Sequence, residues 1–332
     1  MFTWPTISQH SSLAAMVNFE FSGDEIYDGL ELQWYDDDTH GTGMLAFATR
    51  RDTGFVDYYL QDGVRPPAAI KQLGDGVGVW QTTDFDESLL KVDEFGVRAA
   101  AAFNDADGRQ IEVRVDDRGG RVRRSGGLLA PVSDAISAPT SLLLVWLPHF
   151  DLVRTSGSVV ARVDGRDLSL GQLPVQRLWR RRLLKYAAPV EVIEVFPDAS
   201  AKAVDDFGAS DVELRFDPPL PDLNDLAAGE LRSGVWSMPV TAGCLTGGTW
   251  FAQHKPSTDG DLIEVGLDVT DRWQPGPMPL LMQLVTRAIP VFRRWPTTYR
   301  YRATLRPDGT CEAAWQRLGR AGADNYRKAT GT

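Results

Sequence analysis

The sequence predicts an all-β protein of mainly antiparallel strands with one or two short helices. Apolar and polar side chains alternate along many short segments, turn dipeptides recur roughly every ten residues, and helical periodicity is confined to two stretches. The chain has 332 residues, which exceeds a usual single domain and is long enough to bury a large core. We therefore expect one large domain or two ordinary ones, built as barrels or sandwiches.

Alternating segments and turn signals follow one another along the chain. Residues 17–21 and 299–305 place apolar or aromatic side chains at every second position, which is typical of half-buried strands. Asp164-Gly165 lies between two strand-like runs and predicts a hairpin with a type I′ turn. Similar dipeptides occur at Asp107-Gly108 and Asp308-Gly309.

The first helical stretch lies within residues 171–189. Residues 176–186 (QRLWRRRLLKY) contain no Pro or Gly and place Arg177, Arg181 and Lys185 on one helical face. We predict a connecting helix between two β-rich halves. Its basic face is either solvated, with snorkelling arginines, or a peripheral contact with an anionic membrane surface.

The second helical stretch covers residues 279–295, where Pro290 is expected to kink or end the helix. Its first half is apolar nearly all round, which predicts that this half is buried. The resulting division has an N-terminal domain over 17–170 and a C-terminal domain over 190–322, the second containing this helix.

Composition and missing motifs exclude several classes of protein. The formal net charge of −10 is unfavourable for a nucleic-acid binder. No stretch approaches the roughly 18 apolar residues of a membrane span, and the first fifteen residues lack Lys, Arg and a long apolar run, so a cytoplasmic location is expected. Gly-rich phosphate loops, GxSxG and HExxH are absent, so an enzyme built on this chain is expected to use no cofactor.

The stretch LQWYDDDTHGTG combines aromatics, acids and one of four histidines. We expect residues 31–35 and 41–49 to form two strands, with residues 36–40 as their hairpin turn. The three aspartates are then solvated turn residues or local caps. Alternatively, a carboxylate beside His40 favours its charged form, and His40 donates a proton to a bound ligand.

A second acid lies in the predicted strand FVDYYL. Asp57 and Tyr59 should share one face of this strand, because side chains alternate. If that face is apolar, burial raises the pKa of Asp57 and allows it to act as a general acid. If the face is outside, Asp57 is simply solvated.

The apolar run 141–147, which includes Trp146, predicts a strand buried on both faces. His149 follows it and is placed either at the rim of a cavity or in a local structural hydrogen bond. In a later strand, Trp250 and His254 should share one face. A metal site would need His40, His149 and His254 to converge, and nothing in their spacing demands this, so no metal site is predicted.

Residues 31–47 (ELQWYDDDTHGTGMLAF) resemble the first strand pair of the carotenoid 1,2-hydratase / AttH-like family. Members of that family carry a Glu-Trp-Trp-Tyr-type motif before a polar turn and an apolar strand. This chain departs from the motif because two other residues separate the acid from a single Trp. The matching positions are Glu31, Trp34, Tyr35, His40, Gly41 and Met44.

The resemblance implies a pair of lipocalin-like β-barrel domains packed together. Relatives in the wider group bind large apolar molecules, and some hydrate, cyclise or isomerise polyenes and terpenoids without a cofactor. Only Trp34 and Tyr35 carry over, because the family's acidic catalytic residues match no position here.

Two functions therefore stand as expectations. The first is a cofactor-free enzyme in which an acid or His protonates a terpenoid, polyene or steroid-like substrate, and aromatic faces stabilise the resulting cation. The second is a non-catalytic carrier of a lipid-like molecule. A structural interaction protein without a cavity is a third possibility. The candidate catalytic residues are Asp57, His40, His149 and Tyr35, and the candidate ligand-binding residues are Trp34, Tyr59, Trp146, Trp250 and His254.

Overall fold

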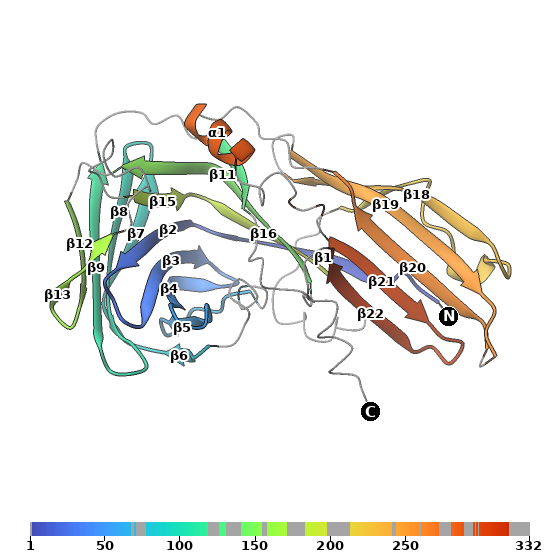
Figure 1. The fold of residues 1–332 in the computed structure, drawn as a ribbon, viewed down its shortest axis with the longest axis horizontal. Helices are drawn as coiled ribbons and strands as arrows, with labels where there is room; N and C mark the ends of the chain where they lie inside the picture. The colour runs from blue at the N-terminus through green and yellow to red at the C-terminus, as the bar shows by residue number, and fades with distance from the viewer. Residues whose placement is uncertain are drawn as a thin grey trace.

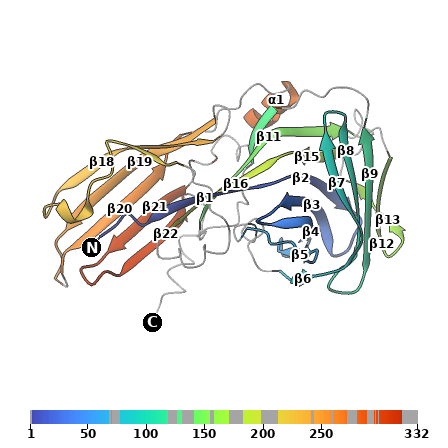
Figure 2. The same ribbon diagram turned by 180° about the vertical axis from the view of Figure 1, so that it is seen from behind.

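A computed structural model gives the architecture of the chain and confirms an all-β protein with antiparallel sheets. Its described strands form three sheets, and the described residues also include an α-helix, α1 (Leu280–Ala288), and a 3₁₀ turn, η3 (Leu223–Asp225). Figures 1 and 2 show two lobes, one containing β2 to β9 and the other containing β18 to β22. The structure describes residues 2–67, 70, 78–118, 126–130, 141–154, 158–170, 183–197, 213–240, 244–258, 260–271, 280–288, 295, 297 and 299–318.

The first sheet has eleven strands in the order β1-β16-β11-β15-β2-β3-β4-β5-β6, with β10 beside β11 and β14 beside β2. Every pairing in it is antiparallel except that of β5 with β6. Its strands are β1 (Thr6–Leu13), β2 (Ala15–Ser22), β3 (Tyr27–Asp37), β4 (Gly41–Arg50), β5 (Val56–Leu60), β6 (Trp80–Thr82), β10 (Gly126–Ala130), β11 (Leu142–Arg154), β14 (Ser169–Leu170), β15 (Leu183–Ala187) and β16 (Val190–Pro197).

The second sheet has five strands in the order β13-β12-β9-β8-β7, and the third has six in the order β17 to β22. Among the described strands, each of the three sheets is an open path. The second sheet contains β7 (Phe85–Asp93), β8 (Gly96–Asn104), β9 (Gln110–Arg118), β12 (Ser158–Val163) and β13 (Arg166–Asp167). The third contains β17 (Arg215–Asp217), β18 (Leu231–Val240), β19 (Cys244–Lys255), β20 (Leu262–Val269), β21 (Tyr299–Leu305) and β22 (Cys311–Arg317).

Two hydrophobic cores divide the molecule. In the first, alternate residues of β2 to β5, such as Phe19, Leu32 and Ala46, pack against the second sheet. In the other, the opposite face of the first sheet joins the inner face of the third sheet, which carries Trp250 and Trp315. Strands β2 to β5 therefore have protein on both faces, which leaves them well placed to position side chains rigidly.

The short-range predictions of strands and turns are confirmed. Asp164 and Gly165 both have positive φ, 50° and 71°, as a type I′ turn requires. Strands β3 and β4 cover the predicted strand pair around residues 31–49, and β11 covers the buried run from residue 141. No helix in the described ranges is long and apolar enough to cross a membrane.

The prediction of a connecting helix is wrong for residues 183–187. Residues 183–187 form β15, which pairs with β2 and with β11, so Lys185 lies on a strand. Its ammonium group pairs with Glu20 at 2.8 Å rather than joining a basic helical face. Arg177 and Arg181 lie outside the described residues. The following strand, β16, starts the range expected for the second domain but belongs to the first sheet.

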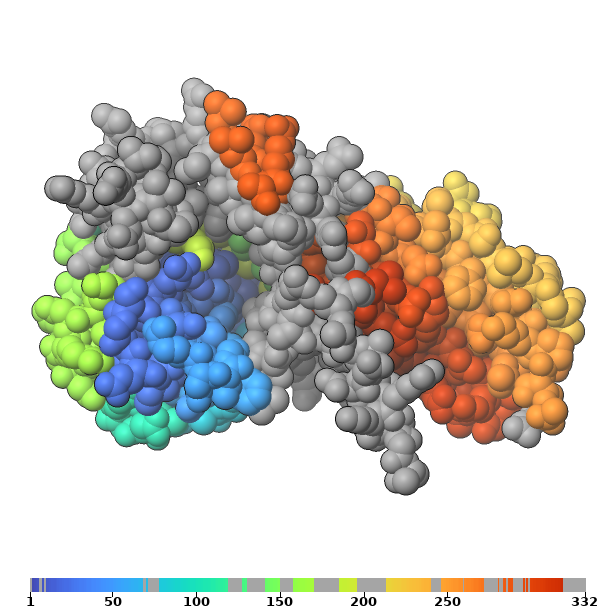
Figure 3. All heavy atoms as spheres, in the orientation of Figure 1, coloured from blue at the N-terminus to red at the C-terminus, as the bar shows by residue number. Residues whose placement is uncertain are grey.

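The second helix is present as α1, and two of the leucines in its first half, which was expected to be buried, are exposed. Leu280 and Leu284 are among the most exposed large apolar side chains in the described part of the chain, at 77% and 61%. The helix itself lies on the outer surface of the molecule (Figure 3).

The N-terminal segment ties the two lobes together. Strand β1 pairs with β16 along its whole length. Just before it, the Pro5 carbonyl accepts a 2.8 Å hydrogen bond from the Tyr301 hydroxyl of the third sheet. Trp4 packs edge-on against Trp250, with ring centroids 5.4 Å apart, and donates from its indole nitrogen to the Pro221 carbonyl. Residues before the predicted first strand are therefore an integral part of the packing.

Candidate functional site

One cross-strand row on the first sheet carries a chemically distinctive set of side chains. Residues that pair directly across neighbouring strands share a face, so the register places these six side chains side by side. The row changes from a cation and an amide, through a carboxylic acid, to three aromatic rings. We call it the Glu31 row, and it consists of Lys185, Asn18, Glu31, Phe47, Tyr58 and Trp80.

Glu31 is partly buried and is held by two amide side chains. Asn18 donates to its Oε2 at 3.2 Å and Gln33 donates to its Oε1 at 2.8 Å. Burial raises the pKa of Glu31 to about 6, although both amides and the nearby Lys185 ammonium favour the ionised form. The side chain can therefore take up and release a proton near neutral pH, as general acid–base catalysis requires.

The aromatic half of the row lies next to this acid. The rings of Phe47 and Tyr58 have centroids 5.8 Å apart, and those of Tyr58 and Trp80 are 4.8 Å apart. The Tyr58 hydroxyl donates to the carbonyl of Ile70 at 3.1 Å, which fixes the ring. Trp80 is exposed at the end of the row. Rings arranged in this way can cover an apolar molecule and attract a cation through their faces.

A second polar group lies along the same face of β3, towards the hairpin. The Tyr35 hydroxyl donates to Gln33 Oε1 at 3.1 Å, and burial raises the pKa of Tyr35 well above its usual value. The Tyr35 and His40 rings have centroids 5.5 Å apart. Tyr35 lies four residues from Glu31, a distance of about 13 Å along a strand. The polar face thus extends from the Glu31 row to His40.

His40 lies beside the Asp37 carboxylate, in line with the sequence-based expectation of a neighbouring acid. Nδ1 of His40 lies 2.9 Å from Asp37 Oδ2. Although partial burial opposes it, hydrogen bonds from the His40 backbone and ring and from the Thr39 amide lower the pKa of Asp37. The His40 side chain is only 6% exposed, and its Nε2 has no hydrogen-bond partner among the described residues. That nitrogen can serve a polar group of a ligand.

Asp57 and Tyr59 share a face of β5, as predicted, but they belong to a closed network. Asp57 is fully buried; its Oδ1 accepts from the Val79 amide at 2.9 Å, and its Oδ2 accepts from the Tyr27 hydroxyl at 2.8 Å and pairs with Arg50 at 2.7 Å. The Tyr27 and Tyr59 hydroxyls lie 2.7 Å apart. Since both carboxylate oxygens are engaged, Asp57 is suited to holding the structure together.

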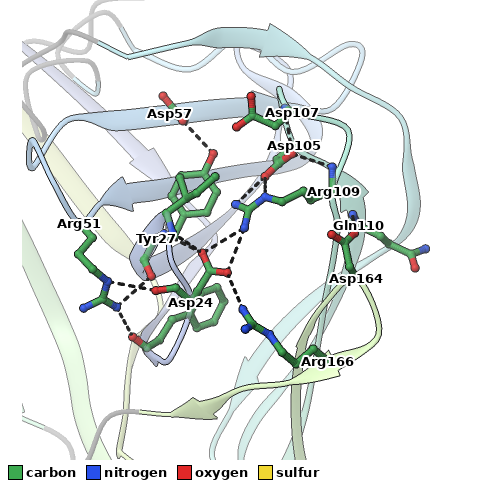
Figure 4. A network of polar contacts seen from close by, with 12 residues as sticks. Asp24, Tyr27, Arg51, Asp57, Asp105, Asp107, Arg109, Gln110, Asp164 and Arg166 are labelled. Atoms are coloured by element: carbon green, nitrogen blue, oxygen red, sulfur yellow. Dashed lines mark hydrogen bonds and ion pairs between the residues drawn. The ribbon is translucent and has the colours of Figure 1, made fainter.

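The network continues to a second pair of buried carboxylates (Figure 4). Arg109 pairs with Asp24 at 3.0 Å and with Asp105 at 2.8 Å, and its guanidinium lies over the Tyr27 ring. These contacts join the turn between β2 and β3 to the hairpin between β8 and β9. Together the two halves of the network close one end of the sandwich formed by the first two sheets.

The remaining predicted residues of the first half lie elsewhere. Trp34 is on the opposite face of β3 from Tyr35 and packs against the core shared with the second sheet. Trp146 is buried on β11, with its ring over Gly127, and His149 is exposed farther along that strand. Among the predicted residues of this half, the rings of Tyr35 and His40 lie next to each other, and the Tyr27 hydroxyl links Asp57 to Tyr59.

Trp250 and His254 share one face of β19 in the third sheet, as predicted. Trp250 is buried against Trp4. His254 Nδ1 lies 2.9 Å from the Leu226 carbonyl, and its Nε2 lies 3.2 Å from Asp261 Oδ2. These contacts engage both ring nitrogens in local structure. The described residues contain no group of three His, Cys, Asp or Glu side chains that could hold a metal ion.

The chain matches no protein-family model, no curated protein and no solved structure. The resemblance of residues 31–47 to the carotenoid 1,2-hydratase / AttH-like family thus stays a prediction, and function has to be argued from the geometry of the chain itself.

The roles of Glu31, Asn18 and Gln33 were not predicted from the sequence. A signal was present, because Glu31 and Gln33 alternate with the apolar Leu30 and Leu32. This alternation usually indicates a solvated outer face. Here the polar face is also covered by protein, so the same pattern marks a buried acid with its hydrogen-bond donors.

The raised pKa of Glu31 predicts how stability depends on pH. Because its folded value of about 6 exceeds the ordinary 4.5, the folded state binds the proton more tightly. The free energy of unfolding should therefore fall as pH rises from about 4.5 to about 6, by about 2 kcal/mol. We expect Glu31→Gln to remove this decline in urea unfolding measured across that range. The exposed Glu87→Gln is the matched control and should keep the wild-type slope.

Proposed function

We propose that this protein is a cofactor-independent enzyme that acts on a large apolar substrate, such as a terpenoid, polyene or steroid-like molecule, by acid–base chemistry. The observation that carries the proposal is Glu31: a partly buried carboxyl group with a pKa of about 6, positioned in one row with three aromatic rings. We include a lipocalin-like barrel in each lobe as part of this proposal. The described strands themselves form open sheets.

In the proposed mechanism, protonated Glu31 donates its proton to one carbon of an alkene or to an enol. The π electrons form the new C–H bond and leave a cation on the neighbouring carbon. The faces of Phe47, Tyr58 and Trp80 stabilise this cation. Loss of a different proton to the Glu31 carboxylate completes an isomerisation or cyclisation. In a hydration, water attacks the cation and the resulting oxonium ion loses a proton to the Glu31 carboxylate, which restores the acid. His40 Nε2 would hold a polar group at the far end of the substrate.

The alternative is a carrier that holds the same class of molecule without changing it. The apolar and aromatic majority on this face of the first sheet favours it, since binding alone needs few polar groups. Glu31 would then anchor a hydroxyl or carbonyl group. The two functions share the ligand and differ in the fate of the proton.

The test begins with native mass spectrometry of the full chain from its own host, with organic extraction of any bound molecule. The extracted compound is then incubated with wild-type protein, Glu31→Gln and the control Glu87→Gln. We expect conversion by the wild type and the control, and conversion at least a hundredfold slower by Glu31→Gln, with binding retained. Binding without conversion by the wild type would establish the carrier. If no apolar compound or apolar dye binds, both proposals are overturned.

A further inference from the structure

The most unusual exposed surface in the described part of the chain is one face of α1. Leu280, Leu284 and Ala288 are all exposed and lie at intervals of four residues, so they form one stripe about 12 Å long. Thr286, on the opposite side, is buried. Two leucines of this helix therefore face solvent, whereas the apolar side chains of a helix packed on a core usually face inward.

The stretch of sequence that contains this helix differs in charge from the rest of the chain. The whole chain carries a net charge of −10, yet no Asp or Glu occurs between Asp271 and Asp308. Seven arginines lie in this interval, and three of them contact groups on the third sheet or the hairpin after β21. The four others are Arg272, Arg287, Arg293 and Arg294.

Arg287 lies on the exposed side of α1, beside the leucine stripe. It is exposed, and no carboxylate in the described ranges pairs with it. The chain is fixed again shortly after the helix, where the buried Trp295 packs edge-on against Tyr299 with ring centroids 5.1 Å apart. Figures 1 and 3 show the helix on the outer surface of the molecule, where a large flat partner can reach it.

We infer that α1 docks on an anionic lipid bilayer. The leucine stripe would enter the boundary between headgroups and acyl chains, while Arg287 would meet the lipid phosphates. Residues 272–307 add no negative charge of their own to this contact. This inference is independent of the proposed function, because it requires neither Glu31 nor a bound apolar substrate.

The experiment is co-sedimentation of the full chain with vesicles of phosphatidylcholine, with or without phosphatidylglycerol. We expect binding to the phosphatidylglycerol vesicles that weakens as salt is raised, because exposed charges are screened. The double variant Leu280→Ser/Leu284→Ser should bind about tenfold more weakly or worse, since it loses the apolar insertion. Arg287→Glu should weaken binding to the anionic vesicles.

The matched control is Leu231→Ser/Val235→Ser on β18, which removes two exposed apolar side chains, 59% and 53% exposed, from the other lobe. It should bind vesicles as the wild type does. All variants should keep the wild-type thermal unfolding midpoint, because the altered side chains are exposed. The inference is overturned if the wild type fails to sediment with anionic vesicles, if the α1 variants bind normally, or if the control loses as much binding as they do.

Discussion

Replacing Asp57 by alanine is expected to lower the free energy of unfolding by about 3 kcal/mol or more. The substitution leaves the Arg50 guanidinium without its carboxylate and removes the acceptor for the Tyr27 hydroxyl and the Val79 amide. Breaking one partner of a buried ion pair is strongly destabilising because it leaves the other charge unpaired. Equilibrium urea unfolding, followed by circular dichroism, measures the change.

The control for this experiment is Asp86→Ala, which removes an exposed acid from β7 in the neighbouring sheet. Its effect should stay within about 0.5 kcal/mol. The double variant Asp57→Ala/Arg50→Ala should be more stable than Asp57→Ala alone, because no unpaired guanidinium remains. If Asp57→Ala instead keeps wild-type stability while abolishing turnover, Asp57 is a catalytic group and the structural role assigned to it is wrong.

Trp250→Ala is expected to destabilise the protein by about 3–5 kcal/mol, the range for removing a buried tryptophan. The indole is fully enclosed in the inner face of the third sheet, and Trp4 packs edge-on against it. The cavity would therefore loosen both the third sheet and the N-terminal segment that crosses it. Urea unfolding gives the size of the change, and protease cleavage near residue 4 reports release of the segment.

Phe95→Ala is the matched control for the tryptophan variant, because it removes an exposed aromatic ring from the turn between β7 and β8. We expect it to change stability by about 0.5 kcal/mol at most. Equal stabilities for the two variants would contradict the packing described for Trp250. Cleavage confined to Trp250→Ala would support the role of Trp4 in holding the segment.

The sequence predicted what depends on neighbouring residues, such as the turn at Asp164-Gly165 and the buried run in β11. Strand β15 was missed because the pattern of residues 183–186 fits a helix as well as a strand. Pairing with β2 and β11 decides between the two, and the sequence does not show which strands are adjacent.

The candidate site was predicted only where its contacts join residues that are close in sequence. The contact of His40 with Asp37 involves residues three positions apart and could be predicted directly. Burial raises the pKa of Glu31, and Asn18 from β2 and Lys185 from β15 oppose that rise, so the value follows only from the strand order and packing. The Arg50 partner of Asp57 likewise comes from the neighbouring strand, and its presence changes the expected role of that acid.

The tie between Pro5 and Tyr301 has a consequence for how the protein is made on the ribosome. The two residues are 296 positions apart, and β1 also has to wait for β16 before it can pair. At roughly 5–20 residues per second, translation delays the contact with Tyr301 by roughly 15–60 s. The edge of β1 stays unpaired until β16 emerges, and Trp4 lacks its partner Trp250 for longer, so nascent chains should recruit chaperones until the third sheet emerges.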